Sequence, residues 1–151
     1  MDDLRFKLLQ SMPVFGGVSR EALNFLISRA VILNLEEGEY FFHEGDAAAS
    51  MFVLEQGAIA ALKMRNGHEF VARELGPGDC FGEMALLDLY PRSASVIARS
   101  HCLAIEVTQT ALFSLYQEDL EQFTIIQMNI GREISRRLRI SDEKLFQRSC
   151  V

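Results

Sequence analysis

Residues 59–75 have the sequence IAALKMRNGHEFVAREL. Two runs rich in branched and aromatic residues flank Asn66-Gly67. This dipeptide is typical of the type I′ turn that joins two antiparallel strands. We therefore predict a β-hairpin, with strands over residues 59–63 and 70–75.

Segments of similar composition lie on both sides of this hairpin, separated by turns rich in glycine, proline and acidic residues. They are residues 31–33, 40–42, 51–54, 94–98 and 103–107. Short strands that recur about every 8–12 residues are typical of an antiparallel sandwich or barrel. A parallel α/β sheet is disfavoured because no helix long enough for a crossover lies between the strands.

Helical spacing replaces the strand pattern at the start of the chain. Up to about Ala30, two apolar stripes predict two helices. The first is expected to end after Gln10 or Ser11, and Ser19 is expected to cap the second.

The end of the chain is predicted to be helical as well. A short helix around Leu112 precedes a segment from Asp119 to about Gln147, in which apolar residues recur at steps of three, four and seven. Such a helix is on the order of 40 Å long, more than one small barrel requires. Two interpretations stay open: the helix covers the body, or its far part meets a partner helix.

Composition limits the class of protein. The 151 residues suit a single domain, and 49% hydrophobic with 24% charged residues exclude wholesale disorder. No apolar run approaches the roughly 20 residues of a membrane-spanning helix, and the acidic start lacks the apolar core of a signal peptide. We therefore expect a soluble, cytoplasmic protein. Cys80, Cys102 and Cys150 are widely spaced, as expected of reduced structural thiols, and we expect the first two to lie in strands.

The net charge of −6 argues against a general binder of polyanions. This charge is distributed unevenly, since residues 1–130 hold 9 basic and 18 acidic side chains, whereas residues 131–151 hold 6 and 3. A function in the tail must therefore be judged separately from one in the body.

Residues 81–96, FGEMALLDLYPRSASV, interrupt the strand pattern with a short helical piece predicted from Glu83 to Leu87. A glycine that enters a helix leaves backbone N–H groups without partners, and these favour an anion such as phosphate. Arg92 follows a proline directly, and its guanidinium can donate to two phosphate oxygens. Ser93 adds a hydroxyl beside it.

Glu83 is an odd residue for a pure phosphate site because its charge repels the anion. It fits a ligand that also offers a hydroxyl donor close to the phosphate, such as a ribose 2′-OH. A 3′,5′-cyclic nucleotide carries both groups. The residues alone leave an alternative open, in which Glu83 and Arg92 form a structural salt bridge.

The window resembles the phosphate-binding cassette of the cyclic nucleotide-binding domain family, where F-G-E-x-A-L is followed after a short spacer by P-R-S/T/A-A. The resemblance extends over nearly the whole chain, because the turn residues at 38, 44–46, 57 and 76–79 fall where that family places its own. Residues 136–145 are similar to the long C-terminal helix of the bacterial catabolite-activator subfamily. Sensor domains like those of protein kinase A regulatory subunits are also similar.

The resemblance implies a mainly β fold with flanking helices. It would be an antiparallel β-roll or jelly-roll (a double-stranded β-helix) in a single domain over residues 1–151. Residues 1–30 would form the N-terminal helices, residues 31–108 the roll with its cassette, and residues 109–151 the C-terminal helices.

The family also implies roles for single residues. Glu83 would accept a hydrogen bond from the ribose 2′-OH, and Arg92 would bind the cyclic phosphate. The backbone N–H groups of Gly82 and Ala85, with the Ser93 hydroxyl, would complete the phosphate site.

Base recognition is implied at the C-terminal helix. Ser141 stands where activator-like members place a hydroxyl that touches adenine. Asp142 departs from that subfamily, in which a second serine reaches the base across a dimer. The expected ligand is cyclic AMP, and Ser93 is compatible with cyclic GMP as well. No further cofactor and no metal is expected.

Other function classes have less support in the sequence. The histidines His43, His68 and His101 form no H-x-H pair, and neither a G-x-S-x-G motif nor a P-loop occurs, so we expect no enzyme. Because the chain stops at Val151, we expect no helix-turn-helix and no direct contact with nucleic acid.

The expected function is a sensor that transmits ligand occupancy through its C-terminal helices, with a hinge around residues 113–119. The expected partners are a second copy bound through the C-terminal helix and an unidentified effector protein or missing effector domain. The alternatives are a ligand-independent interaction or dimerisation module of the same fold, and a truncated transcription regulator.

Overall fold

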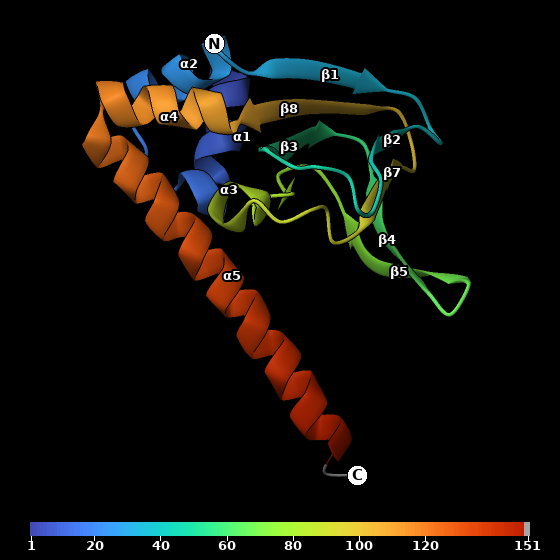
Figure 1. Cartoon of the computed structure of the whole chain (residues 1–151). Helices are drawn as coiled ribbons and strands as arrows, with labels where there is room; N and C mark the ends of the chain where they lie inside the picture. Colours follow the sequence, from blue (N-terminus) through green and yellow to red (C-terminus); the bar gives the residue numbers. More distant parts are fainter. Residues whose placement is uncertain (150–151) are drawn as a thin grey trace.

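The structure, a computed structural model, describes residues 1–149 and consists of two four-stranded sheets with helices at both ends of the chain (Figure 1). Every strand pair is antiparallel. The strands are β1 Val31–Leu35, β2 Tyr40–Phe42, β3 Ser50–Gln56, β4 Ile59–Arg65, β5 His68–Leu75, β6 Cys80–Phe81, β7 Ser95–Ala98 and β8 Cys102–Thr108. The helices are α1 Asp3–Ser11, the 3-10 helix η1 Pro13–Phe15, α2 Arg20–Ser28, α3 Ala85–Asp88, α4 Gln109–Glu118 and α5 Leu120–Ser149. The predicted mainly β class with flanking helices is confirmed.

The strand order is β1-β8-β3-β6 in one sheet and β2-β7-β4-β5 in the other. The predicted hairpin joins β4 and β5, with Arg65 paired to His68. Asn66 and Gly67 have φ angles of 53° and 76°, the two positive values that a type I′ turn requires. The dipeptide therefore acts as predicted.

Two apolar clusters hold the sheets and helices together. One packs α1, α2, α4 and α5 against the first sheet and is centred on residues such as Leu23, Leu26 and Ile105. The other fills the space between the sheets, where the Phe52 and Phe81 rings stack 5.2 Å apart. Burial of aromatic rings contributes strongly to such a core, and this second cluster includes Phe81 and Val96 of the cassette window.

The predicted helix boundaries are largely confirmed. The Ser19 hydroxyl accepts a hydrogen bond from the Ala22 N–H at 3.1 Å, which caps α2 as predicted. The predicted start of the cassette helix is wrong, because α3 begins at Ala85 and not at Glu83. Glu83 and Met84 form a turn instead. Cys80 was expected to lie in a strand, and it lies in β6.

The buried residues of the long helix α5 all lie in its first half. Ile126, Asn129 and Ile130 are buried, and the Asn129 amide donates to the carbonyls of Val14 and Gly16 at 3.2 and 2.8 Å. The second half runs on past the sheets (Figure 1). None of the described helices is long and apolar enough to cross a membrane.

The cysteines at 80 and 102 lie in β6 and β8 as buried free thiols. Burial raises the pKa of Cys80 to about 12, and the charge of Glu83 adds to the effect. Cys150 lies outside the described residues.

Candidate functional site

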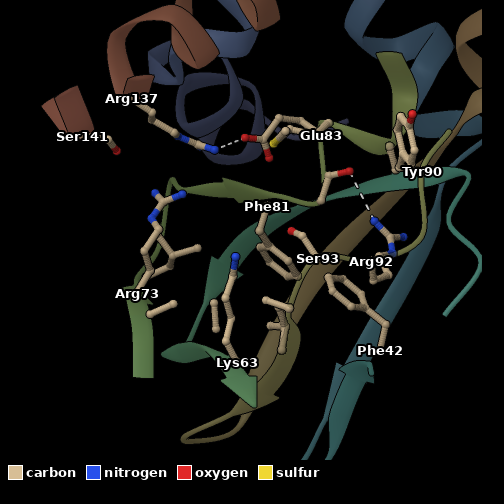
Figure 2. A pocket seen from close by; sticks show the side chains of 18 of the residues that line it. Phe42, Lys63, Arg73, Phe81, Glu83, Tyr90, Arg92, Ser93, Arg137 and Ser141 are labelled. Carbon is tan, nitrogen blue, oxygen red and sulfur yellow. Dashed lines mark hydrogen bonds and ion pairs between the residues drawn. The ribbon is translucent and has the colours of Figure 1, made fainter. Parts of the chain in front are cut away.

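A cavity of about 720 Å³ opens between β4, β5, the cassette and the second half of α5. All of the predicted site residues line it, namely Gly82, Glu83, Ala85, Arg92, Ser93 and Ser141. Figure 2 shows that the cassette supplies one wall of this cavity and α5 the opposite wall. The residues predicted from the sequence therefore line one common cavity. Asp142 is not among the residues that line it.

Arg92 lies at the cassette end of the cavity with only 8% of its surface exposed. Its Nη1 donates to the carbonyls of Ser50 and Gly82 at 2.9 and 3.3 Å, and its Nη2 contacts the Ser50 hydroxyl at 3.2 Å. The guanidinium also lies over the Phe42 ring, 4.1 Å from its centroid. These contacts hold a buried cation in one place.

One donor of this guanidinium is unused. Among residues 1–149, Arg92 Nε is buried without a hydrogen-bond partner. A buried N–H that lacks a partner costs free energy, and a guanidinium forms its strongest hydrogen bonds with anions. Burial lowers the pKa of Arg92, while the charges of Glu106 and Asp46 raise it.

Gly82 allows this arrangement because it has no side chain. Its φ is +76°, and a Cβ added there would lie 2.6 Å from Arg92 Nη1. Any other residue at this position would therefore push the guanidinium away, in addition to straining the backbone.

Glu83 is almost fully buried at 2% exposure and forms an ion pair with Arg137 of α5 (Figure 2). Arg137 Nη1 donates to Glu83 Oε1, and Arg137 Nε lies 3.6 Å from Glu133 Oε1. Because a carboxylate has two oxygens that each accept, Glu83 Oε2 can still accept from a ligand hydroxyl. This ion pair links the cassette directly to the long helix.

The alternative interpretation, in which Glu83 and Arg92 form a structural salt bridge, is wrong. Within residues 1–149 the two side chains form no ion pair, since Glu83 contacts Arg137 and Arg92 contacts Ser50 and Gly82. Glu83 and Arg92 therefore line one cavity but have different partners.

The backbone groups differ from the expectation. The Ala85 N–H donates to the Gly82 carbonyl at 3.3 Å. At four residues, α3 is also too short to supply an appreciable helix dipole. The positive pole of the site is therefore the Arg92 side chain.

Several cavity residues were not predicted as site residues. Lys63 in β4 and Arg73 in β5 both line the cavity, as do Arg137 and Lys144 of α5. Arg137 stands four residues before Ser141, a spacing that puts two helix residues on one face, and this signal could have found it. Lys63 and Arg73 lie on the same face of the sheet. Arg73 pairs with Ala61, and Ala61 and Lys63 are two residues apart in one strand, so their side chains face the same way.

Comparison with known proteins agrees with this geometry. The family model described as "Cyclic nucleotide-binding domain" matches residues 32–119, more than half of the chain. The chain belongs to the cyclic nucleotide-binding domain family. Residues 32–119 contain both sheets beyond the first residue of β1, and they contain the whole cassette, so the match covers the wall that holds Arg92.

Two curated members of this family show its range. The chain is 29% identical over 142 residues to the "Cyclic AMP receptor protein" of Thermus thermophilus, covering 91% of this chain and 62% of that protein. It is also 29% identical over 138 residues to the "cGMP-dependent protein kinase" of Toxoplasma gondii, covering 91% of this chain and 13% of the kinase. The chain thus spans less than two thirds of either relative.

A solved structure in the family has the same fold. The Thermus thermophilus catabolite activator protein superposes with a TM-score of 0.80 at 27% identity, over 91% of this chain and 63% of that chain. The resemblance identified from the cassette, including the β-roll fold, is therefore confirmed.

Proposed function

We propose that this chain is a cyclic nucleotide sensor that binds its ligand in the 720 Å³ cavity without chemical turnover. The observation that carries the proposal is Arg92, a buried guanidinium at the cavity wall with one donor still unpaired among residues 1–149. A cyclic phosphate supplies the missing acceptor, and charge-assisted hydrogen bonds of this kind are among the strongest in proteins.

The remaining predicted residues would complete the ligand site. Glu83 Oε2 accepts from the ribose 2′-OH while Oε1 keeps its bond to Arg137. The Ser93 hydroxyl and the Gly82 N–H would donate to the phosphate, and the Ala85 N–H could join them only by giving up its bond to the Gly82 carbonyl. Ser141 of α5 donates to or accepts from the base.

Cyclic AMP is the first ligand that we propose, because the Thermus relative is named for it. The Ser141 hydroxyl can both donate and accept, so it can pair with the adenine edge. Cyclic AMP binding should therefore be the first measurement.

Arg73 supports cyclic GMP as a second candidate. It lines the cavity from β5, and in the part of the chain that the structure describes it forms no ion pair within 4 Å. A guanidinium pairs well with the O6 and N7 acceptors of guanine, whereas adenine presents an N6 donor beside N7. The Toxoplasma relative is named as a cGMP-dependent kinase.

Occupancy would be transmitted through the ion pair of Glu83 with Arg137. A ligand hydroxyl on Glu83 changes the strength of this contact, and α5 responds because it carries Arg137. The hinge would lie at Asp119, where the backbone between α4 and α5 leaves helical geometry with φ −152° and ψ 85°. A ligand shifts such a helix only by its different affinity for the two arrangements.

The far part of α5 also fits a homodimer contact. Leu138 and Leu145 are seven residues apart and mostly exposed, at 60% and 61%. This heptad spacing is typical of helices that pair in a coiled coil. The effector that receives the signal would be another protein or a further domain.

Calorimetric titration with cyclic AMP and cyclic GMP tests this proposal. We expect saturable binding of one ligand per chain, intact nucleotide after long incubation, and a change in elution volume with ligand. Arg73→Ala should weaken cyclic GMP binding more than cyclic AMP binding, with Lys144→Ala as a matched loss of charge at the same cavity. Absence of binding for both nucleotides would support a ligand-independent interaction module instead.

A further inference from the structure

Ser50, which contacts Arg92, also contacts Glu106, and neither Ser50 nor Glu106 has a role in the proposed ligand binding. Ser50 is the first residue of β3 and is 6% exposed. Its hydroxyl hydrogen-bonds to Glu106 Oε2 of β8 at 2.7 Å, and its oxygen lies 3.2 Å from Arg92 Nη2. The three side chains therefore form a chain from β8 through β3 to the cassette.

The hydrogen positions along this chain follow from chemistry. A serine hydroxyl has one hydrogen and two acceptor lone pairs, and neither an ionised carboxylate nor a guanidinium can exchange its role. The Ser50 hydrogen must therefore go to Glu106, which turns the lone pairs of the same oxygen toward Arg92. Glu106 thus fixes the rotation of the Ser50 hydroxyl so that a lone pair of its oxygen faces the guanidinium.

Arg92 needs such a restraint because it stands between two spaces. It lines the ligand cavity on one side, and on the other a second cavity of about 500 Å³ that Ser50, Glu106 and Asp46 also line. The carboxylates of Glu106 and Asp46 both attract the guanidinium toward this rear cavity. Without the Ser50 hydroxyl, Nη2 loses its contact, and the carbonyl bonds of Nη1 and the Phe42 ring are left to oppose the attraction toward the rear cavity.

We propose that Glu106, acting through the Ser50 hydroxyl, is a positioning residue that holds Arg92 at the wall of the ligand cavity. This inference rests on the proposed function, in which Arg92 binds the cyclic phosphate. Glu106 itself touches no ligand, and its position in β8 is fixed by the pairing of Phe52 with Glu106.

The sign of one substitution separates this role from simple electrostatics. A carboxylate behind the phosphate site repels the anion, so if charge alone mattered Glu106→Ala would tighten cyclic nucleotide binding. Under the positioning role it weakens binding, because Ser50 loses the acceptor that orients its hydroxyl. We expect about tenfold weaker binding, the effect of losing roughly one hydrogen bond to a charged group.

The experiment measures cyclic nucleotide affinity by calorimetry and folding by thermal unfolding for five proteins. They are the wild type, Glu106→Ala, Ser50→Ala, the double variant, and Glu69→Ala as a control at an exposed residue of β5 that lines neither cavity. The two single variants should weaken binding equally, and the double variant should be no weaker than either, because the two residues act in one chain. A sixth protein, Ser50→Thr, keeps a hydroxyl and should retain most of the affinity that Ser50→Ala loses.

The outcomes distinguish the inference from the function on which it rests. If the wild type binds no cyclic nucleotide, the proposed function fails. If the wild type binds and Glu106→Ala binds equally or more tightly, or Glu69→Ala loses as much affinity, the positioning role fails alone. Should Glu106→Ala not fold, Glu106→Gln keeps the size and a neutral acceptor, and we expect a smaller loss of the same sign.

Discussion

Arg92 and Arg137 reach the same cavity from opposite walls, and they are held in very different ways. Arg92 is buried and fixed by two backbone carbonyls, a hydroxyl and an aromatic ring. Arg137 sits on the half of α5 that leaves the body, and its contacts to the cassette depend on Glu83. The first wall therefore holds its charge through several contacts with the body, whereas the charge on the second wall is held by ion pairs with Glu83 and Glu133.

The largest expected effect comes from removing the fixed charge. Arg92→Leu should abolish measurable cyclic nucleotide binding, a loss of about a hundredfold or more, because the phosphate loses its charge-assisted donors. Calorimetry measures the affinity, and circular dichroism checks that the variant stays folded. Unchanged affinity in a folded variant would overturn the assignment of Arg92 and with it the contrast between the walls.

Gly82→Ala tests whether the first wall must be rigid. The new Cβ would lie 2.6 Å from Arg92 Nη1, so we expect ten- to a hundredfold weaker binding. Gly67→Ala is the matched control, since Gly67 has the same φ of +76° and no atom within 4 Å of the added Cβ. Both variants carry a backbone strain of roughly 1–2 kcal/mol, and only the first should lose affinity. Equal losses in the two would mean that strain, and not displacement of Arg92, weakens binding.

The same contrast explains how much of the site the sequence predicts. Gly82, Glu83, Arg92 and Ser93 were found because they lie within one window, where turn geometry and spacing suffice to bring them together. The type I′ hairpin at Asn66-Gly67 was predicted for the same reason, since the dipeptide itself adopts the positive φ angles.

What was missed depends on contacts between distant segments. Glu106 and Ser50 are 56 residues apart, and Arg137 is 54 residues from Glu83. Helix spacing relative to Ser141 could have placed Arg137 at the cavity, but no local pattern pairs it with Glu83 or pairs Glu106 with Ser50, because helix packing and strand pairing bring these partners together. The start of α3 was displaced by two residues since Gly82, with φ +76°, begins a turn before the helix.

The titration of Cys80 tests whether β6, which leads into the cassette, is closed to water. Burial raises the pKa of its thiol from 9.0 to about 12, so the folded protein keeps the thiol protonated where the unfolded chain ionises. The stabilisation is therefore complete below pH 9 and is lost progressively as the pH rises from 9 toward 12. Between neutral pH and pH 10, the free energy of unfolding of the wild type should fall by about 1.4 kcal/mol relative to Cys80→Ala. Parallel curves from denaturant unfolding would show that water reaches β6.

Arg137→Ala should have the smallest effect on affinity, within about threefold, because Arg92 and Glu83 stay in place and Arg137 is not needed to bind the phosphate. Its effect should appear in the helix. Loss of the ion pair removes the tie between the cassette and the second half of α5, so amide hydrogen exchange beyond Glu133 should become faster. The side chain of Arg137 is 25% exposed, and water can therefore solvate the carboxylate of Glu83 that remains.

Arg139→Ala removes the same charge two residues later, from an exposed position that does not line the cavity. Its exchange pattern should match that of the wild type. If Arg137→Ala instead lowers affinity as strongly as Arg92→Leu and leaves exchange in α5 unchanged, then Arg137 belongs to the fixed ligand site. Both walls would in that case bind the ligand, and the effect of ligand binding would have to be transmitted to α5 through another contact.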